Sequence, residues 1–81
     1  MSIEELVPLT NGLSITACSH TFMCDRARIT GVSETSVDLA FWIAGTDYVP
    51  RLRLARAKLA VETPETVAGI VRRVAARAVC G

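Results

Sequence analysis

The stretch "SVDLAFWIA", residues 36–44, is the clearest β-strand in this sequence and decides the fold. Apolar residues recur at every second position, as expected of a strand with one buried face. The apolar face carries Val37, Leu39, Phe41 and Ile43, and the opposite face carries Asp38, Ala40 and Trp42. We therefore expect a strand that packs one face on a core and leaves the indole of Trp42 on the other.

Two segments lead into this strand from its N-terminal side. The residues "RARITGV", 26–32, alternate in the same way, and the following "SETS", 33–36, is typical of a turn. Before them, residues 13–24 also alternate and are rich in side chains that favour strands. These patterns predict neighbouring antiparallel strands.

The first twelve residues allow two interpretations. Asn11-Gly12 is typical of a two-residue hairpin turn because both residues tolerate positive φ. Residues 6–9 would then be an edge strand, where Pro8 is tolerated. Alternatively, Ser2 and Glu5 have the spacing of a capping box, which predicts a short helix that Pro8 ends. We favour the hairpin.

Residues 51–61, "RLRLARAKLAV", also fit two structures. They are good helix formers, and Pro50 suits the first position of a helix. A helix, however, would split the leucines between opposite sides. A strand with one bulge near residues 54–55 avoids this split, and we favour it. Its inward residues would be Leu52, Leu54, Ala57, Leu59 and Val61.

The residues "TPET", 63–66, predict the start of a C-terminal helix. Thr63 suits the N-cap, Pro64 the first helical position, and Glu65 complements the helix dipole. We expect the last two residues, 80–81, to be frayed. The apolar stripe of this helix comprises Val67, Ile70, Val71, Val74 and Ala78.

These elements predict one domain, residues 1–81, of the α+β class. We expect an antiparallel meander of four or five strands with the single C-terminal helix packed on one face. Hydrophobic residues make up 51% of the chain, which excludes a disordered protein. No apolar run approaches the ~20 residues of a membrane span, and the N-terminus lacks the basic region of a secretory signal. The sequence therefore predicts a cytoplasmic protein without membrane contact.

The segment "ACSHTFMCDRA", residues 17–27, holds the only histidine and two of the three cysteines. On a straight strand Cys18 and Cys24 would lie about 20 Å apart, too far to share a zinc ion with His20. A nucleophilic thiol needs a base within hydrogen-bond reach, and the spacing of Cys18 and His20 does not impose that contact. We predict a strand whose cysteines are small hydrophobic side chains or free thiols, with no metal, cofactor or catalytic residue.

Charge is distributed unevenly, although the net charge is only +1. Residues 1–50 carry two arginines against six carboxylates, net −4, and residues 51–81 carry seven basic side chains against two carboxylates, net +5. A strand at 51–61 would present a row of basic side chains to solvent, either as a binding surface or paired with acidic residues of the adjacent strand.

We predict a binding surface around this basic row and Trp42. The loop at 44–50 is short enough to return the chain beside its own strand, so we expect Arg51 or Arg53 to stack on the indole. Tryptophan, tyrosine and arginine are enriched at binding hot spots. The predicted partner-binding residues are Trp42, Tyr48, Arg51, Arg53, Arg56 and Lys58.

The sequence contains no motif that predicts an enzyme, since the glycines are isolated and there is one histidine. We predict a stand-alone protein-interaction module that regulates or inhibits a larger host assembly, of the kind that phages and mobile elements encode. We expect a protein partner with an acidic or mixed surface, with a homodimer as a further option. The first alternative is a nucleic-acid-binding regulator that uses the basic strand. The second is a small thiol-dependent enzyme or redox protein that uses Cys18 and His20.

Overall fold

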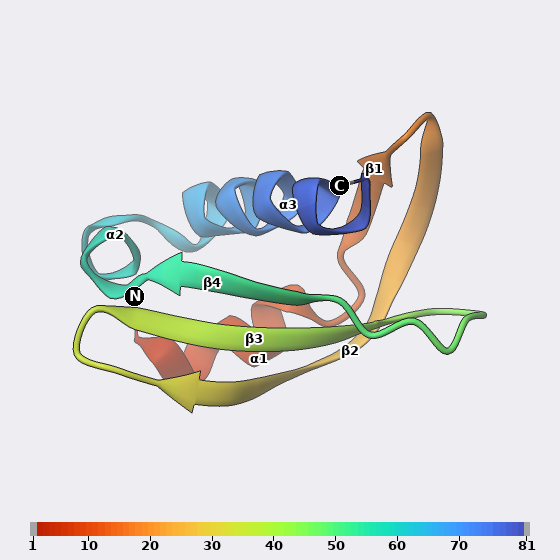
Figure 1. Ribbon diagram of the computed structural model, residues 1–81. Helices are drawn as coiled ribbons and strands as arrows, with labels where there is room; N and C mark the ends of the chain where they lie inside the picture. Colours follow the sequence, from red (N-terminus) through yellow and green to blue (C-terminus); the bar gives the residue numbers. More distant parts are fainter. Residues whose placement is uncertain (1, 81) are drawn as a thin grey trace.

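The computed structural model describes residues 2–80 and contains one sheet whose four antiparallel strands follow one another in chain order (Figure 1). The strands are β1 (Ser14–Ala17), β2 (His20–Val32), β3 (Ser36–Ile43) and β4 (Arg51–Ala55). The helices are η1 (Ile3–Glu5, a 3-10 helix), α1 (Leu6–Thr10), α2 (Arg56–Val61) and α3 (Pro64–Cys80). The predicted α+β class, with a meander sheet and a C-terminal helix packed against it, is confirmed.

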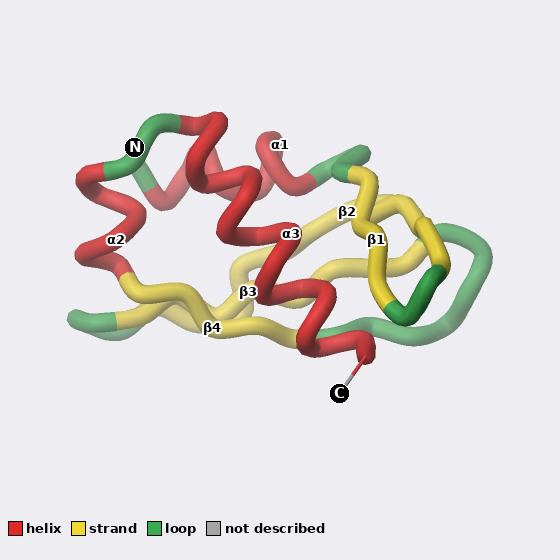
Figure 2. Tube along the Cα trace, turned by 90° about the horizontal axis from the view of Figure 1, so that it is seen from above, coloured by secondary structure: helices red, strands yellow, loops and turns green. Residues whose placement is uncertain are grey.

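The sheet curls, and α3 crosses its open side between the two edge strands, β4 and β1 (Figure 2). Helix α1 packs against β2 and α3 and closes the remaining gap. We call the side of the sheet that these helices cover the inner face, and the opposite side the outer face. The fully buried residues of the inner core include Leu6, Ile15, Cys24, Val37, Leu39, Phe41, Val67 and Val71. The facing predicted for the central strand is therefore correct.

The N-terminal segment is helical, so the predicted hairpin is wrong. The backbone N–H of Ser2 donates to the carboxylate of Glu5 at 3.1 Å, as in a capping box. Pro8 lies in the first turn of α1, where its missing N–H breaks no hydrogen bond within that helix. A helix forms here instead of the hairpin because the helical period places Leu6 and Thr10 on one side, where both are fully buried.

Asn11 and Gly12 still form a turn, but it connects α1 to β1. Asn11 has φ −61° and ψ 125°, Gly12 has φ +80°, and the N–H of Leu13 donates to the carbonyl of Thr10. These are the features of a type II turn, which needs glycine at its third position. The Asn11 side chain also accepts a hydrogen bond from the N–H of Ala27 at 2.8 Å, which fixes the turn against β2.

The cysteine-containing segment is a hairpin rather than the continuous strand that we predicted. The chain reverses at Cys18 and Ser19, whose φ angles are 54° and 66°, and Ala17 pairs with His20. Two residues with positive φ make the turn type that matches strand twist, although neither residue favours that conformation. The reversal pairs β1 with the start of β2, which lets β1 cover the end of the core.

The segment at 51–61 is divided between a strand and a helix. Leu52 and Leu54 face inward in β4, as predicted, but the chain becomes helical at Arg56 and Val61 is 79% exposed. The prediction of a strand to residue 61 is wrong because β3 begins opposite Ala55 and offers no further backbone to pair with. The chain then forms its hydrogen bonds locally, as its helix-favouring residues permit.

The start of α3 is as predicted. The N–H of Thr66 donates to the hydroxyl of Thr63 at 3.3 Å, which makes Thr63 the N-cap. The helix extends through Cys80, so the fraying expected at that residue is not observed, and Gly81 lies outside the described residues. Within the predicted stripe, Val67 and Val71 are fully buried.

Candidate functional site

The outer face gathers four arginines and the only tryptophan. Cross-strand pairing places Arg26 beside Trp42 and Arg28 and Arg51 on either side of Ala40. All four arginines are exposed, and the buried apolar side chains of α1, α2 and α3, with the partly buried Ile3 of η1, belong to the inner core. The outer-face residues are Arg26, Arg28 and Thr30 of β2, Asp38, Ala40 and Trp42 of β3, and Arg51 and Arg53 of β4.

Trp42 is stacked by an arginine, but not by one of those predicted. The guanidinium carbon of Arg26 lies 4.2 Å from the centre of the indole ring, within the range of a cation–π contact. Arg51 pairs with Ala40 instead, and Trp42 lies beyond the end of the β3–β4 pairing. The prediction was wrong because it considered only one of the two strands that flank β3.

Asp38 neutralises one of the four arginines. Its carboxylate accepts hydrogen bonds from Nε and Nη2 of Arg53 at 2.7 and 3.3 Å. This hydrogen bond lowers the pKa of Asp38, so the carboxylate stays charged at neutral pH and its pairing is lost only as the pH falls through that lowered pKa. Among residues 2–80, Arg26, Arg28 and Arg51 lie beyond salt-bridge distance of any carboxylate. The outer face therefore carries net positive charge.

Two adjoining hollows lie in the outer face. The larger occupies about 330 Å³ above Ala40, between the side chains of Arg28 and Arg51, with Trp42 and Val49 in its lining. We call it the Ala40 hollow. The second, of about 280 Å³, adjoins it at Thr30 and Arg51 and is lined by Thr30, Asp38, Arg51, Leu52 and Arg53. The arginines thus border depressions that a partner's side chains could enter.

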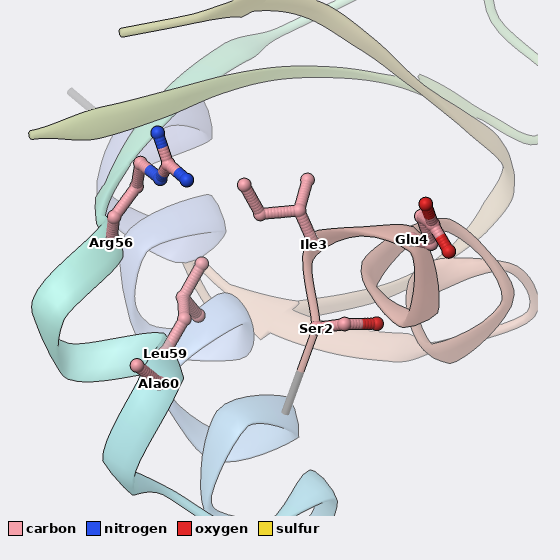
Figure 3. Close-up of a pocket in the computed structure, with 6 residues that line it drawn as sticks. All are labelled: Ser2, Ile3, Glu4, Arg56, Leu59 and Ala60. Carbon is pink, nitrogen blue, oxygen red and sulfur yellow. The ribbon is translucent and has the colours of Figure 1, made fainter. Parts of the chain in front are cut away.

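The other predicted site residues lie away from the outer-face arginines. Arg56 donates from Nη1 to the carbonyl of Ser33 at 2.7 Å and borders a separate pocket of about 370 Å³ between η1 and α2. Figure 3 shows Ile3 between Glu4 and Arg56, and these two charged side chains of the pocket form no salt bridge. Lys58 is exposed on α2.

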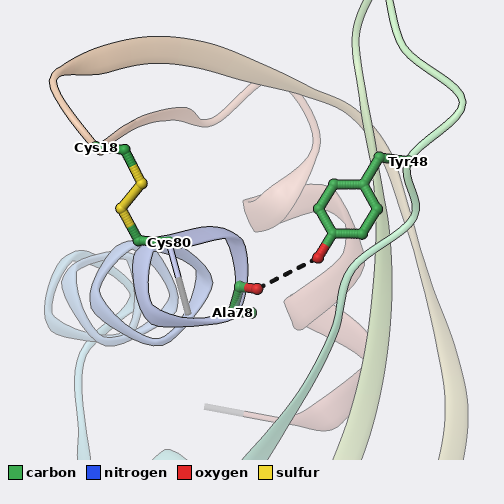
Figure 4. The surroundings of a disulfide bond; sticks show 4 residues. All are labelled: Cys18, Tyr48, Ala78 and Cys80. Atoms are coloured by element: carbon green, nitrogen blue, oxygen red, sulfur yellow. Dashed lines mark hydrogen bonds between the residues drawn. A yellow bond between two sulfur atoms is a disulfide. The ribbon is translucent and has the colours of Figure 1, made fainter.

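Tyr48 is bound to the C-terminal end of α3. Its hydroxyl donates to the carbonyl of Ala78 at 3.3 Å, close to the disulfide between Cys18 and Cys80 (Figure 4). This contact gives the tyrosine a structural role in holding the β3–β4 loop to the helix. The structure therefore brings together Trp42, Arg51 and Arg53 of the predicted site and separates them from Tyr48.

Sequence reasoning missed Arg26 and Arg28 as members of the site. Their alternation in "RARIT" indicated that both point away from the core, which the structure confirms. Strand order was the missing information, because β2 and β4 flank β3 and bring arginines from distant segments to its two sides.

The cysteines differ from their predicted state. Cys18 and Cys80 form a disulfide with a Cα–Cα distance of 5.7 Å, whereas we expected free thiols. Cys24 is free and buried, as predicted. Its burial and, to a smaller extent, the neighbouring charge of Asp25 raise the pKa of its thiol. A thiolate is therefore disfavoured at Cys24, and the sulfur of Cys18 is already bonded.

Residues 2–80 contain no cluster of three side chains suited to hold a metal ion. None of the helices in this part of the chain has the length and hydrophobicity that a membrane span requires. No protein-family model, curated protein or solved structure matches the chain.

Proposed function

We propose that the protein is a small interaction module that regulates or inhibits a larger assembly by binding an acidic protein surface through its outer face. The observation that carries this proposal is the grouping of three arginines without carboxylate partners around one half-buried indole, on a face that no described helix covers. Arginine and tryptophan are the side chains most enriched at binding hot spots, and positive charge steers acidic partners to the surface.

The aromatic content of the outer face favours a protein partner over nucleic acid. Proteins that bind single strands stack successive bases on several aromatic rings. Here Trp42 is the one aromatic residue of the outer face, and Arg26 lies over one face of its ring, so the outer face cannot stack successive bases. Phe41 is buried in the core and Tyr48 is bound to α3.

A paired charge reversal tests the proposed surface. In a pull-down from a lysate of the host, treated with nuclease, the double variant Arg28→Glu/Arg51→Glu should lose its protein partner, because glutamate repels an acidic surface. The matched control is Arg73→Glu/Arg77→Glu, which makes the same charge change at two exposed positions of α3. The purified partner's affinity, measured by calorimetry, should fall at least about a hundredfold for the first pair, since each lost charged hydrogen bond contributes about 1.5–3 kcal/mol. Equal behaviour of the two pairs would place the interface elsewhere.

Removing the outer-face carboxylate should strengthen the same interaction. Asp38→Asn frees Arg53 from its salt bridge and adds one positive charge to the outer face. We expect a few-fold gain in affinity for the acidic partner, expressed as faster association at low salt. Stopped-flow measurements of wild type and variant would check this, and slower association of the variant would show that the partner is not acidic.

A nucleic-acid-binding regulator is the second candidate, because the same three free arginines could contact phosphates. Titration of the protein with random single-stranded DNA at increasing salt separates the two functions. Tight binding that weakens steeply with salt would favour nucleic acid, whereas a nuclease-resistant protein complex favours the first proposal.

The cytoplasmic location expected from the sequence stays a proposal. Thiols in that compartment are kept reduced, so Cys18 and Cys80 would there be adjacent thiols rather than a disulfide. The redox state of this pair in protein isolated with a thiol-blocking reagent would report which kind of compartment the protein occupies.

A further inference from the structure

The Ala40 hollow has the small side chain of Ala40 at its base and a positively charged arginine on each of two sides. Ala40 lies on the central strand, and its cross-strand neighbours on both sides are arginines, Arg28 and Arg51. With strands about 4.8 Å apart, the Cα atoms of these two arginines are separated by roughly 10 Å. Because alanine ends at Cβ, its side chain leaves room above the strand, and the hollow of about 330 Å³ occupies this position.

The two ends of the hollow differ in chemistry. One is formed by the indole of Trp42 and the side chain of Val49, which are apolar and half-buried. The other is formed at Thr30 and leads toward Asp38 and Arg53, which neutralise each other. Positive charge is therefore concentrated at the two sides, and apolar surface lies at one end, where the Arg26 guanidinium also contacts the indole.

We propose that this hollow is an anchor site for an acidic side chain of the partner protein, an inference that rests on the proposed function. An adjacent apolar side chain of the partner would pack on Trp42 and Val49. A carboxylate has two oxygens and can accept hydrogen bonds from guanidinium groups on both sides, so its single negative charge pairs with both arginines and lowers their combined charge from +2 to +1. The apolar neighbour removes part of the indole from water. The recognised element is thus a glutamate or aspartate next to an apolar residue.

Trp42 is the only tryptophan in the chain, so its fluorescence reports directly on the hollow. The probe is a tryptophan-free peptide containing three glutamate–leucine pairs separated by glycine and serine. Two peptides of the same length serve as controls, one with glutamine replacing glutamate and one with serine replacing leucine. We expect saturable binding of the first peptide in the millimolar range or tighter, none of the glutamine peptide, and about tenfold weaker binding of the serine peptide.

Variants of the protein locate the binding. Arg28→Ala and Arg51→Ala should each weaken binding of the glutamate–leucine peptide by about tenfold or more, whereas Arg73→Ala, with the same change in net charge on α3, should leave it unchanged. Ala40→Val fills the floor without changing charge and should also weaken binding by about tenfold. Circular dichroism shows whether each variant is folded. If Ala40→Val does not fold, the two arginine variants decide whether the peptide binds in the hollow.

The anchor site would be overturned by no saturable binding of the glutamate–leucine peptide, by an equal effect of Arg73→Ala and Arg28→Ala, or by tighter binding of an oligothymidylate of equal charge. If folded Ala40→Val binds the peptide normally while the Arg28→Glu/Arg51→Glu variant still loses the partner, the anchor site is wrong and the proposed outer-face interaction stands. If the glutamate–leucine peptide binds as expected but the partner protein still binds the Arg28→Glu/Arg51→Glu variant, the proposed function is wrong instead.

Discussion

Replacing Phe41 with alanine is expected to lower the free energy of unfolding by about 3–5 kcal/mol. Phe41 is the largest of the fully buried side chains and lies in the middle of the inner face of β3. Its removal leaves a cavity that neighbours on both the sheet and the helices cannot fill. A domain of 81 residues has a total stability of roughly 4–12 kcal/mol, so the variant would be partly or largely unfolded.

Urea denaturation followed by circular dichroism measures this loss. Phe22→Ala is the matched control, because Phe22 belongs to the neighbouring strand but is only half-buried. This variant should lower the free energy of unfolding clearly less than Phe41→Ala does. If Phe41→Ala and wild type unfold at the same urea concentration, the inner and outer faces of β3 have been assigned in reverse.

Breaking the disulfide is expected to cost about 4 kcal/mol. The bond between Cys18 and Cys80 closes a loop of 62 residues, and restricting so long a loop removes much of the entropy of the unfolded chain. The variant Cys80→Ser breaks the bond without altering the unusual backbone of the turn at Cys18. It also removes one attachment of the end of α3, which the hydroxyl of Tyr48 and the packing of Val79 on the core still hold.

Thiol titration and thermal melting test this prediction together. Denatured protein without reductant should show one thiol, that of Cys24, and three thiols after reduction. Reduction of the wild type should lower its Tm as far as Cys80→Ser does, whereas reductant should not affect the Tm of that variant. Three thiols before reduction would show that the disulfide does not form.

The central strand and the last helix could be predicted because local and global signals agree there. Along β3, strand-favouring residues alternate with a period of two, and the four side chains predicted to face the core are all buried. In α3, the N-cap at Thr63, Pro64 and the apolar stripe all indicate the same element. The outward position of Trp42 follows from the same alternation.

Other features depend on contacts between distant segments and carry no local signal. The turn at Cys18 and Ser19 uses residues that seldom adopt positive φ, and the disulfide to the other end of the chain holds its first residue. The change from β4 to α2 at Arg56 is set by where the partner strand begins. Likewise, Arg26 contacts Trp42 only because β2 lies beside β3. The grouping of the outer-face arginines therefore could not be predicted without the strand order.

Site-specific photocrosslinking tests most directly whether a protein partner binds the outer face. A photoreactive amino acid would replace Thr30, which is exposed beside both hollows, or Arg73, which is exposed on α3. On illumination in cells that produce the protein we expect a specific protein adduct from position 30 that disappears when Arg28→Glu and Arg51→Glu are added, and none from position 73. An adduct from position 73 alone, or one from position 30 that survives both charge reversals, would contradict binding through the outer-face arginines.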